Sequence, residues 1–123
     1  MARTASPGAG VRSARILAHT LPTLILVQAF LAGRALFGGW SITVHGVIGN
    51  VTFAVVLATL ALAWRAGLRK ATTVAAVLAV LVTAQIGLGY SGRETAEAAA
   101  WHVPLGVTIF GLAVYLLTLV PRR

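Results

Sequence analysis

Four long apolar segments, separated by short polar stretches, dominate the sequence. They run over residues 16–36, 42–64, 72–90 and 98–120. Each is about 20 residues long, which at about 1.5 Å per residue is enough to cross a hydrocarbon core of about 30 Å. Because the connections are short, consecutive helices should pack as antiparallel neighbours. The pattern therefore predicts an all-α, four-helix transmembrane bundle over residues 16–123.

The composition narrows the class of protein further. Of the 123 residues, 59% are hydrophobic and 10% are charged, whereas a soluble domain is about 25% charged. The net charge of +8 would suit a nucleic-acid-binding protein, but the basic residues flank the apolar segments and do not cluster with aromatic residues. We therefore expect a lipid bilayer and no nucleic acid as partner. The chain has no cysteine, which excludes disulfides and thiolate chemistry.

Basic residues are distributed unevenly between the two ends of the expected bundle. Arg34 and Arg93 lie at one end, the latter beside Glu94 and Glu97. Because cytoplasmic loops carry an excess of Lys and Arg, the other end is predicted to be cytoplasmic, with both termini, in a bacterial plasma membrane. Residues 1–15, which are rich in Ala, Gly and Ser, are expected to form a disordered cytoplasmic tail. The basic residues at the cytoplasmic end are Arg3, Arg12, Arg15, Arg65, Arg69, Lys70, Arg122 and Arg123.

A glutamine, a histidine and a glycine recur at the same spacing in the two halves of the chain. Both copies read Gln-x16-His-x3-Gly, and they are offset by 57 residues. We interpret them as two tandem two-helix hairpin repeats, related by an axis along the membrane normal. Polar residues are costly inside a bilayer, so a duplicated set is a candidate site. The residues are Gln28, His45 and Gly49 in the first half and Gln85, His102 and Gly106 in the second.

The two histidines are the candidate metal ligands. His45 and His102 both lie about one turn into a predicted helix, about 5 Å below its outer boundary, and the twofold relation places them across the bundle from each other. Zinc usually takes three or four ligands, and Glu97 has no counterpart near His45. A proton relay would usually include an embedded carboxylate, and the four apolar segments contain none. Haem iron needs only two axial ligands and fits between the helices of a bundle, so the pattern favours haem.

The glycines and glutamines each allow two interpretations. Gly49 and Gly106 lie on the same helix face as the histidines. They would either leave room for a flat ligand or let the helices pack closely. Gln28 and Gln85 each need a hydrogen-bond partner inside the membrane. That partner would be a histidine, the edge of a cofactor, or the backbone of a neighbouring helix.

Three further polar residues lie near the expected membrane boundaries. Arg34 and Arg93 are at the outer end, where guanidinium groups would either pair with haem propionates or anchor the helices at the interface. His19 is near the cytoplasmic start of the first segment, and alanine occupies the equivalent position in the second half. We therefore expect His19 to be an interfacial residue and not a ligand.

These features resemble one four-helix half of the haem A synthase family, and also small four-helix bacterial membrane proteins that share the histidines. The resemblance rests on His45 and His102 near the outer starts of the second and fourth helices. It rests also on the glutamines followed by outer glycines, as in Gln28 with Gly33. It covers nearly all of the chain after the tail, and it implies the four-helix scaffold and haem b.

Two features of the haem A synthase family differ in this sequence. The family has an acidic residue close before a ligand histidine in its catalytic half, whereas residues 41–44, which precede His45, include no acid. Many bacterial members carry a cysteine pair in an outer loop, and this chain has no cysteine. The resemblance therefore implies haem binding without oxidation of a haem methyl group.

The sequence thus predicts a b-type membrane cytochrome that holds one haem b between His45 and His102 for electron transfer. Its expected partners are a quinol or an external redox protein, and it would act as a homodimer or within a larger membrane complex. Haem storage or delivery is one alternative, and a non-haem accessory subunit is another. A third is a haem-modifying oxidoreductase completed by dimerisation, against which the missing acid argues.

Overall fold

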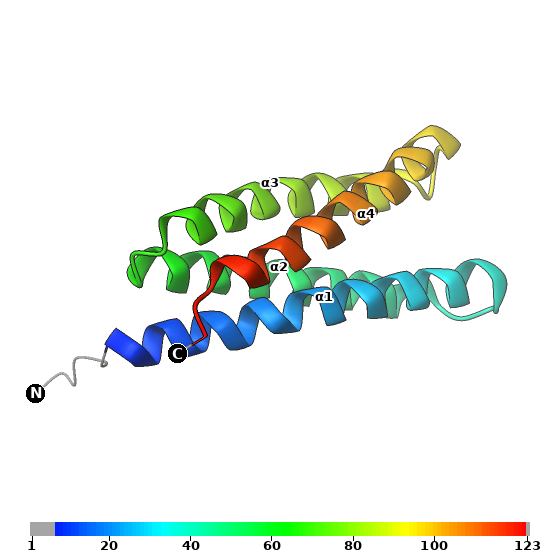
Figure 1. The fold of residues 1–123 in the computed structure, drawn as a ribbon. Coiled ribbons are helices and arrows are strands. Elements are labelled where there is room, and N and C mark those ends of the chain that lie inside the picture. The colour runs from blue at the N-terminus through cyan, green and yellow to red at the C-terminus, as the bar shows by residue number, and fades with distance from the viewer. Residues whose placement is uncertain (1–6, 123) are drawn as a thin grey trace, which may run out of the picture.

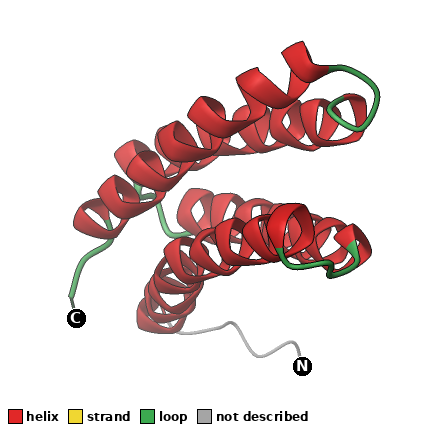
Figure 2. Cartoon of the chain, turned by 90° about the vertical axis from the view of Figure 1, so that its right-hand side faces the viewer, coloured by secondary structure: helices red, strands yellow, loops and turns green. Residues whose placement is uncertain are grey.

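The computed structural model describes residues 7–122, which form four long helices. Helices α1 and α2 form one antiparallel hairpin, and α3 and α4 form a second that lies beside it (Figures 1 and 2). Within the described residues, the backbone of each helix comes close to its two neighbours around the bundle and not to the diagonal helix. The predicted all-α four-helix bundle is therefore confirmed. The helices are α1 (Pro7–Phe37), α2 (Ile42–Arg65), α3 (Arg69–Ser91) and α4 (Ala96–Leu119).

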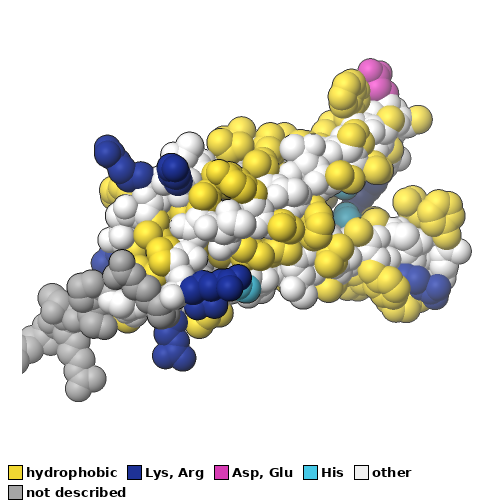
Figure 3. Space-filling model, in the orientation of Figure 1, with side chains coloured by type: hydrophobic (Ala, Val, Ile, Leu, Met, Phe, Trp, Pro, Cys, Tyr) yellow, Lys and Arg dark blue, Asp and Glu magenta, His cyan; other side chains and the backbone are white. Residues whose placement is uncertain are grey.

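The outer surface of the bundle is apolar over most of its length (Figure 3). All four helices are long and apolar enough to cross a membrane. Large hydrophobic side chains such as Phe30, Val80 and Val107 are 58–69% exposed. Soluble monomers rarely expose contiguous apolar patches beyond a few hundred Å², so lipid is the solvent that suits this surface. The prediction of a multi-pass membrane protein is borne out.

Small residues form the core in the half of the bundle that carries the termini. Small side chains let membrane helices approach closely and gain van der Waals contact. Larger side chains, among them Leu21, Leu78 and Leu116, fill the remaining space and are at most 1% exposed. Because few residues are buried towards the opposite end, the helices are held together mainly in this half. The fully buried alanines, at most 1% exposed, are Ala14, Ala18, Ala63, Ala71, Ala75 and Ala113.

Helix α1 begins at Pro7 and not near residue 16, so residues 7–15 are helical. The expectation of a disordered tail over residues 1–15 is wrong for this part, and residues 1–6 lie outside the described residues. Two physical reasons account for the difference. A proline at the first helical position lacks only an N–H that would be unpaired there anyway. Ala14 and Ala18 are completely buried, so this part of the helix is stabilised by packing, which composition alone does not reveal.

Side-chain caps fix the starts of the two helices that carry His45 and His102. The backbone N–H of Thr43 donates to Ser41 Oγ at 3.2 Å at the start of α2. The backbone N–H of Ala98 donates to Thr95 Oγ1 at 3.3 Å at the start of α4. Ser and Thr at these positions pair N–H groups that the helix itself leaves free. The caps therefore fix where α2 and α4 begin, and with it the distance of each histidine from the start of its helix.

Candidate functional site

A cavity of about 600 Å³ lies between the four helices in the half away from the termini. Figure 3 shows the molecule hollowed at this end, between the two hairpins. Pockets that hold cofactors or drug-sized ligands measure about 300–1,000 Å³. The described lining is mostly apolar, with one histidine and one glutamine from each hairpin. Of the predicted site residues, those that line it are Gln28, His45, Gly49, Gln85, Arg93, His102 and Gly106.

The structure brings His45 and His102 together inside this cavity. Their ring centroids are 6.1 Å apart and their planes are inclined at 61°. The two residues belong to α2 and α4, which lie on a diagonal of the bundle and whose backbones do not come close to each other among the described residues. The two imidazoles therefore approach each other across the space between the helices.

Both imidazoles are held by the same kind of hydrogen bond. His45 Nδ1 bonds to the backbone carbonyl oxygen of Gln28 at 3.1 Å, and His102 Nδ1 bonds to that of Gln85 at 3.0 Å. Because a carbonyl oxygen can only accept, Nδ1 carries the proton, and the Nε2 of a neutral ring keeps its lone pair. Histidines that bind metals usually donate their other ring N–H in this way. Each ring is therefore in the tautomer that can ligate a metal through Nε2.

The separation of the rings fits ligation from opposite sides of one metal ion. With metal–nitrogen bonds of about 2.0 Å, two opposed imidazoles have centroids about 6 Å apart, whereas neighbouring tetrahedral positions bring them to about 5 Å. The observed 6.1 Å matches the opposed arrangement. Among the described residues, no group of three or more His, Cys, Asp and Glu is placed to hold a metal ion. Two histidines suit a metal that takes two protein ligands better than a tetrahedral zinc site.

The glycines of the repeated pattern make room for the glutamines. A Cβ atom added at Gly49 would lie 2.8 Å from Gln28 Nε2, and one added at Gly106 would lie 3.0 Å from Gln85 Nε2. Gln85 Nε2 also donates to the backbone carbonyl oxygen of His102 at 2.9 Å. Both glycines thus allow close contact between the helices, and both also line the cavity, so room for a flat ligand stays a prediction. Each glutamine thus joins the two helices of its own hairpin at the level of the histidine.

The glutamine side chains also bring two unpaired acceptors to the site. Gln28 Oε1 and Gln85 Oε1 are buried and have no hydrogen-bond partner among the described residues. Both glutamines line the cavity. An unsatisfied buried acceptor costs about 1–3 kcal/mol.

Of the two predicted arginines, only Arg93 belongs to the cavity lining. It reaches from the α3–α4 connection towards α2, where its Nη2 lies 3.9 Å from a Cβ position built at Gly46. Arg34 instead lies over the ring of Trp40, with its Cζ 4.9 Å from the ring centroid. Its guanidinium and backbone carbonyl also lie close to Gly38. Arg34 is therefore outside the described lining of the cavity and packs on the α1–α2 connection, and its pairing with a haem carboxylate stays a prediction.

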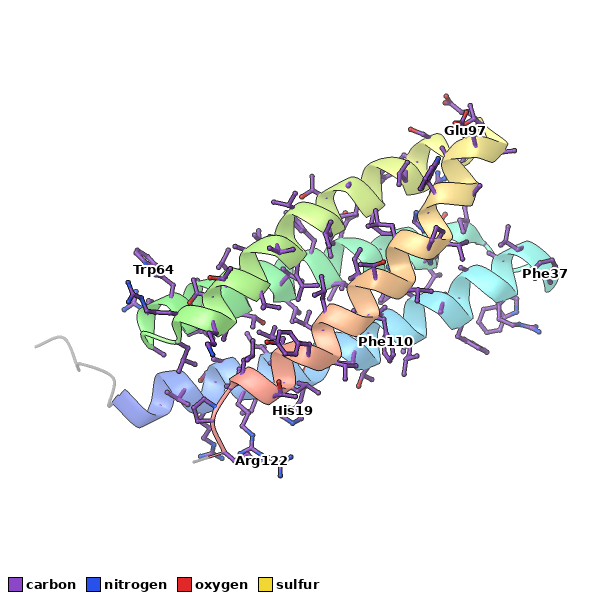
Figure 4. All side chains as sticks on the ribbon, turned by 45° about the horizontal axis from the view of Figure 1, so that its top comes forward. His19, Phe37, Trp64, Glu97, Phe110 and Arg122 are labelled. Carbon is purple, nitrogen blue, oxygen red and sulfur yellow. The ribbon has the colours of Figure 1, made fainter. Side chains whose placement is uncertain are left out.

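The third histidine lies at the opposite end of the bundle. Figure 4 shows His19 near the end that carries the termini, and Glu97 at the far end, beyond the cavity. The His19 ring is exposed, and its Nδ1 bonds to the backbone carbonyl oxygen of Arg15 at 2.9 Å. His19 therefore lies far from the other two histidines and near the end of the bundle, as expected for a residue at the membrane interface.

Sequence reasoning did not assign a role to Gly89. A Cβ atom added there would lie 3.0 Å from His102 Cε1, so this glycine makes room for the imidazole. The sequence feature that could have indicated this role is the position of Gly89 four residues after Gln85, on the same face of α3. The equivalent position in the first hairpin is Ala32, so comparison of the two halves does not reveal it. The fit around His102 is therefore tighter than the repeat predicts.

The fold and this cavity define a multi-pass membrane protein with an intramembrane site flanked by two histidines. Comparison of the chain with models of protein families, with curated proteins and with solved structures finds no match. Any more specific function therefore has to be argued from the residues of the site itself.

Proposed function

We propose that the protein is a four-helix membrane cytochrome of b type, in which His45 and His102 are the axial ligands of one haem b. The observation that carries this proposal is the pair of imidazoles 6.1 Å apart, each with Nδ1 bonded to a backbone carbonyl. The resemblance of the Gln–His–Gly spacing to one half of the haem A synthase family supports the same cofactor. The cavity of about 600 Å³ and its mainly apolar lining suit a large planar ligand.

Several other residues would serve the bound haem. Apolar side chains such as Ile25, Val82 and Ile109 line the cavity and would contact the macrocycle. Arg93 would pair with a haem carboxylate, because a guanidinium matches a carboxylate with two N–H groups.

In both hairpins a histidine bonds to the carbonyl of a glutamine 17 residues earlier. This recurrence supports the interpretation as two tandem hairpin repeats.

The charge distribution supports an orientation for the site. Of the eight Lys and Arg residues that the structure describes, six belong to the end that carries the termini, which favours cytoplasmic termini and a haem near the outer face. The cavity lies in the opposite half of the bundle, consistent with that placement. A quinol in the outer leaflet or an external redox protein would then be the nearest partner.

Electron transfer is the role that two histidine ligands favour. A haem held by both would supply a one-electron Fe(III)/Fe(II) couple with no axial position left for a substrate. No acidic residue is among the described lining of the cavity, which argues against a haem-modifying oxidoreductase. Storage or delivery of haem would use the same ligands and is the second candidate. A haem-free accessory subunit would not require the two matched Nδ1 bonds.

A visible difference spectrum tests the proposal. Full-length protein expressed with ample haem should purify coloured, and its dithionite-reduced minus oxidised spectrum should show a sharp α band at the b-type position. A pyridine haemochrome assay should give about one haem b per chain, because one pair of axial ligands is present. A colourless protein would show that the proposal is wrong. Rapid transfer of the haem to an apoprotein acceptor would favour storage or delivery over electron transfer.

The two arginines offer a matched pair of variants. Arg93→Gln should weaken haem retention about two- to fivefold, as expected for an exposed arginine–carboxylate pair. It should also lower the midpoint potential, because a nearby positive charge disfavours the more positive Fe(III) state. Arg34→Gln removes the same charge outside the cavity and should leave both properties unchanged. Haem-release kinetics and a redox titration measure the two effects, and equal changes in both variants would exclude the specific role of Arg93.

A further inference from the structure

Polar side chains form a stripe along one face of the N-terminal part of α1. Most of them recur at intervals of three or four residues, which brings them to one side of the helix. The stripe and the exposed side chain of Ile16 line a shallow, open hollow on the surface of α1. We refer to these residues as the α1 polar stripe: Arg12, Arg15, His19, Thr20 and Thr23.

The positive charge of this stripe has no acidic partner in the chain. The sequence contains only two acidic side chains, Glu94 and Glu97. Figure 3 shows the acidic side chains at the end of the molecule opposite the N-terminus, and Figure 4 shows Glu97 far from His19. Neither glutamate therefore pairs with Arg12 or Arg15, and an anion from the surroundings can approach the two guanidinium groups. Two guanidinium groups on adjacent turns offer paired N–H donors that suit the oxygens of a phosphate group.

The length of α1 places the stripe at the level of lipid headgroups. The helix has 31 residues and is therefore about 46 Å long, which exceeds a hydrocarbon thickness of about 30 Å. Counting about 20 residues back from Phe37 puts the boundary of the hydrocarbon core near Leu17. Arg12 and Arg15 then lie among the headgroups, and Thr20 and Thr23 lie just inside the apolar layer.

The apolar part of the hollow distinguishes a lipid from a soluble anion. Ile16 lies between the two arginines and the threonines and is 57% exposed. A site in which two cationic groups lie beside an exposed apolar side chain suits a molecule with an anionic head and an acyl chain. Free phosphate would use only the cationic end.

We propose that the α1 polar stripe binds the phosphate group of an anionic phospholipid in the leaflet on the side of the termini. The proposal depends on the helical structure of residues 7–15, which gives Arg12 and Arg15 fixed positions on one face. It does not depend on haem, so either proposal can fail without the other.

Native mass spectrometry of the full-length protein in detergent tests this site. Phosphatidylglycerol should be retained about 30-fold more strongly than phosphatidylcholine, since each of the two basic residues contributes about 1 kcal/mol to the attraction of anionic lipid. The double variant Arg12→Gln with Arg15→Gln should reduce the affinity for phosphatidylglycerol by about tenfold or more. Its affinity for phosphatidylcholine should not change.

A second double variant controls for charge alone. Arg65→Gln with Arg69→Gln removes two charges from the same end of the bundle, at exposed positions outside the hollow, and should retain phosphatidylglycerol within about twofold. Equal losses in both double variants would overturn the proposal, as would equal retention of the two lipids by the wild type. Displacement of the lipid by an equimolar amount of inorganic phosphate would assign the hollow to a soluble anion instead. Circular dichroism of each variant verifies that the helices are intact.

Discussion

His45→Ala and His102→Ala should each abolish the b-type absorption band, whereas His19→Ala should leave it unchanged. Each of the first two substitutions removes one of the two imidazoles whose centroids lie 6.1 Å apart in the cavity. Loss of a residue that only orients a ligand costs about 10–100-fold in metal affinity, and loss of the ligand itself should cost more. The difference spectrum and the haem content per chain measure the effect.

His19 is a close control because its imidazole is held in the same manner. Its Nδ1 bonds to a backbone carbonyl at 2.9 Å, but it lies outside the cavity.

Rescue by added imidazole separates ligation from folding. His45→Gly should regain the band when imidazole is supplied, because the free ring can occupy the space that the side chain leaves. Full retention of the band in both alanine variants would refute the assignment of the ligands.

Gly49→Leu and Gly106→Leu should cause the second largest effect, a loss of both haem and thermal stability. Even a Cβ atom at these positions would lie 2.8 Å and 3.0 Å from the amide nitrogens of the glutamines. A larger side chain must displace them, and at Gly106 this breaks the hydrogen bond from Gln85 Nε2 to the His102 carbonyl. Overpacking of this kind typically costs about 1–3 kcal/mol. Haem content and the thermal midpoint in detergent report the two losses.

Gly111→Leu is the matched control on α4. A Cβ atom there meets nothing within 4 Å among the described residues. Replacing a glycine within a helix stabilises it by about 0.5–1 kcal/mol, so this variant should be at least as stable as the wild type.

A double-mutant cycle identifies the contact responsible. Gly106→Ala should destabilise the wild type but should be tolerated once Gln85→Ala has removed the amide, because neighbouring residues are energetically coupled. Additive effects of the two substitutions would show that Gly106 does not act through Gln85.

Much of the fold could be predicted because the membrane imposes simple lengths. An apolar run of about 20 residues indicates a spanning helix, and α2 begins at Ile42, as the pattern predicts. The spacing shared by His45 and His102 placed both at one depth, and short connections placed their helices in antiparallel hairpins. Depth and helix order together were enough to predict that the two rings lie across the bundle from each other.

Other features could not be predicted because they depend on rotation and on packing between helices. Arg34 is near the expected end of α1, but its side chain lies on Trp40, which in turn packs edge-on against Phe30 with centroids 6.0 Å apart. Sequence spacing gives the depth of a residue and not which neighbouring side chain covers it. Similarly, the role of Gly49 depends on how closely α1 approaches α2, which no local pattern encodes.

The buried residues are concentrated in one half of the bundle. The residues that stabilise the fold therefore differ from those that line the cavity. Alanines such as Ala18, Ala63 and Ala75 join the helices near the termini, whereas the cavity occupies the other half. Apolar residues that line only the cavity, for example Leu88, are therefore free to vary in shape without loss of the core. Such a scaffold could acquire a different occupant during evolution while the chain continued to fold in the same way.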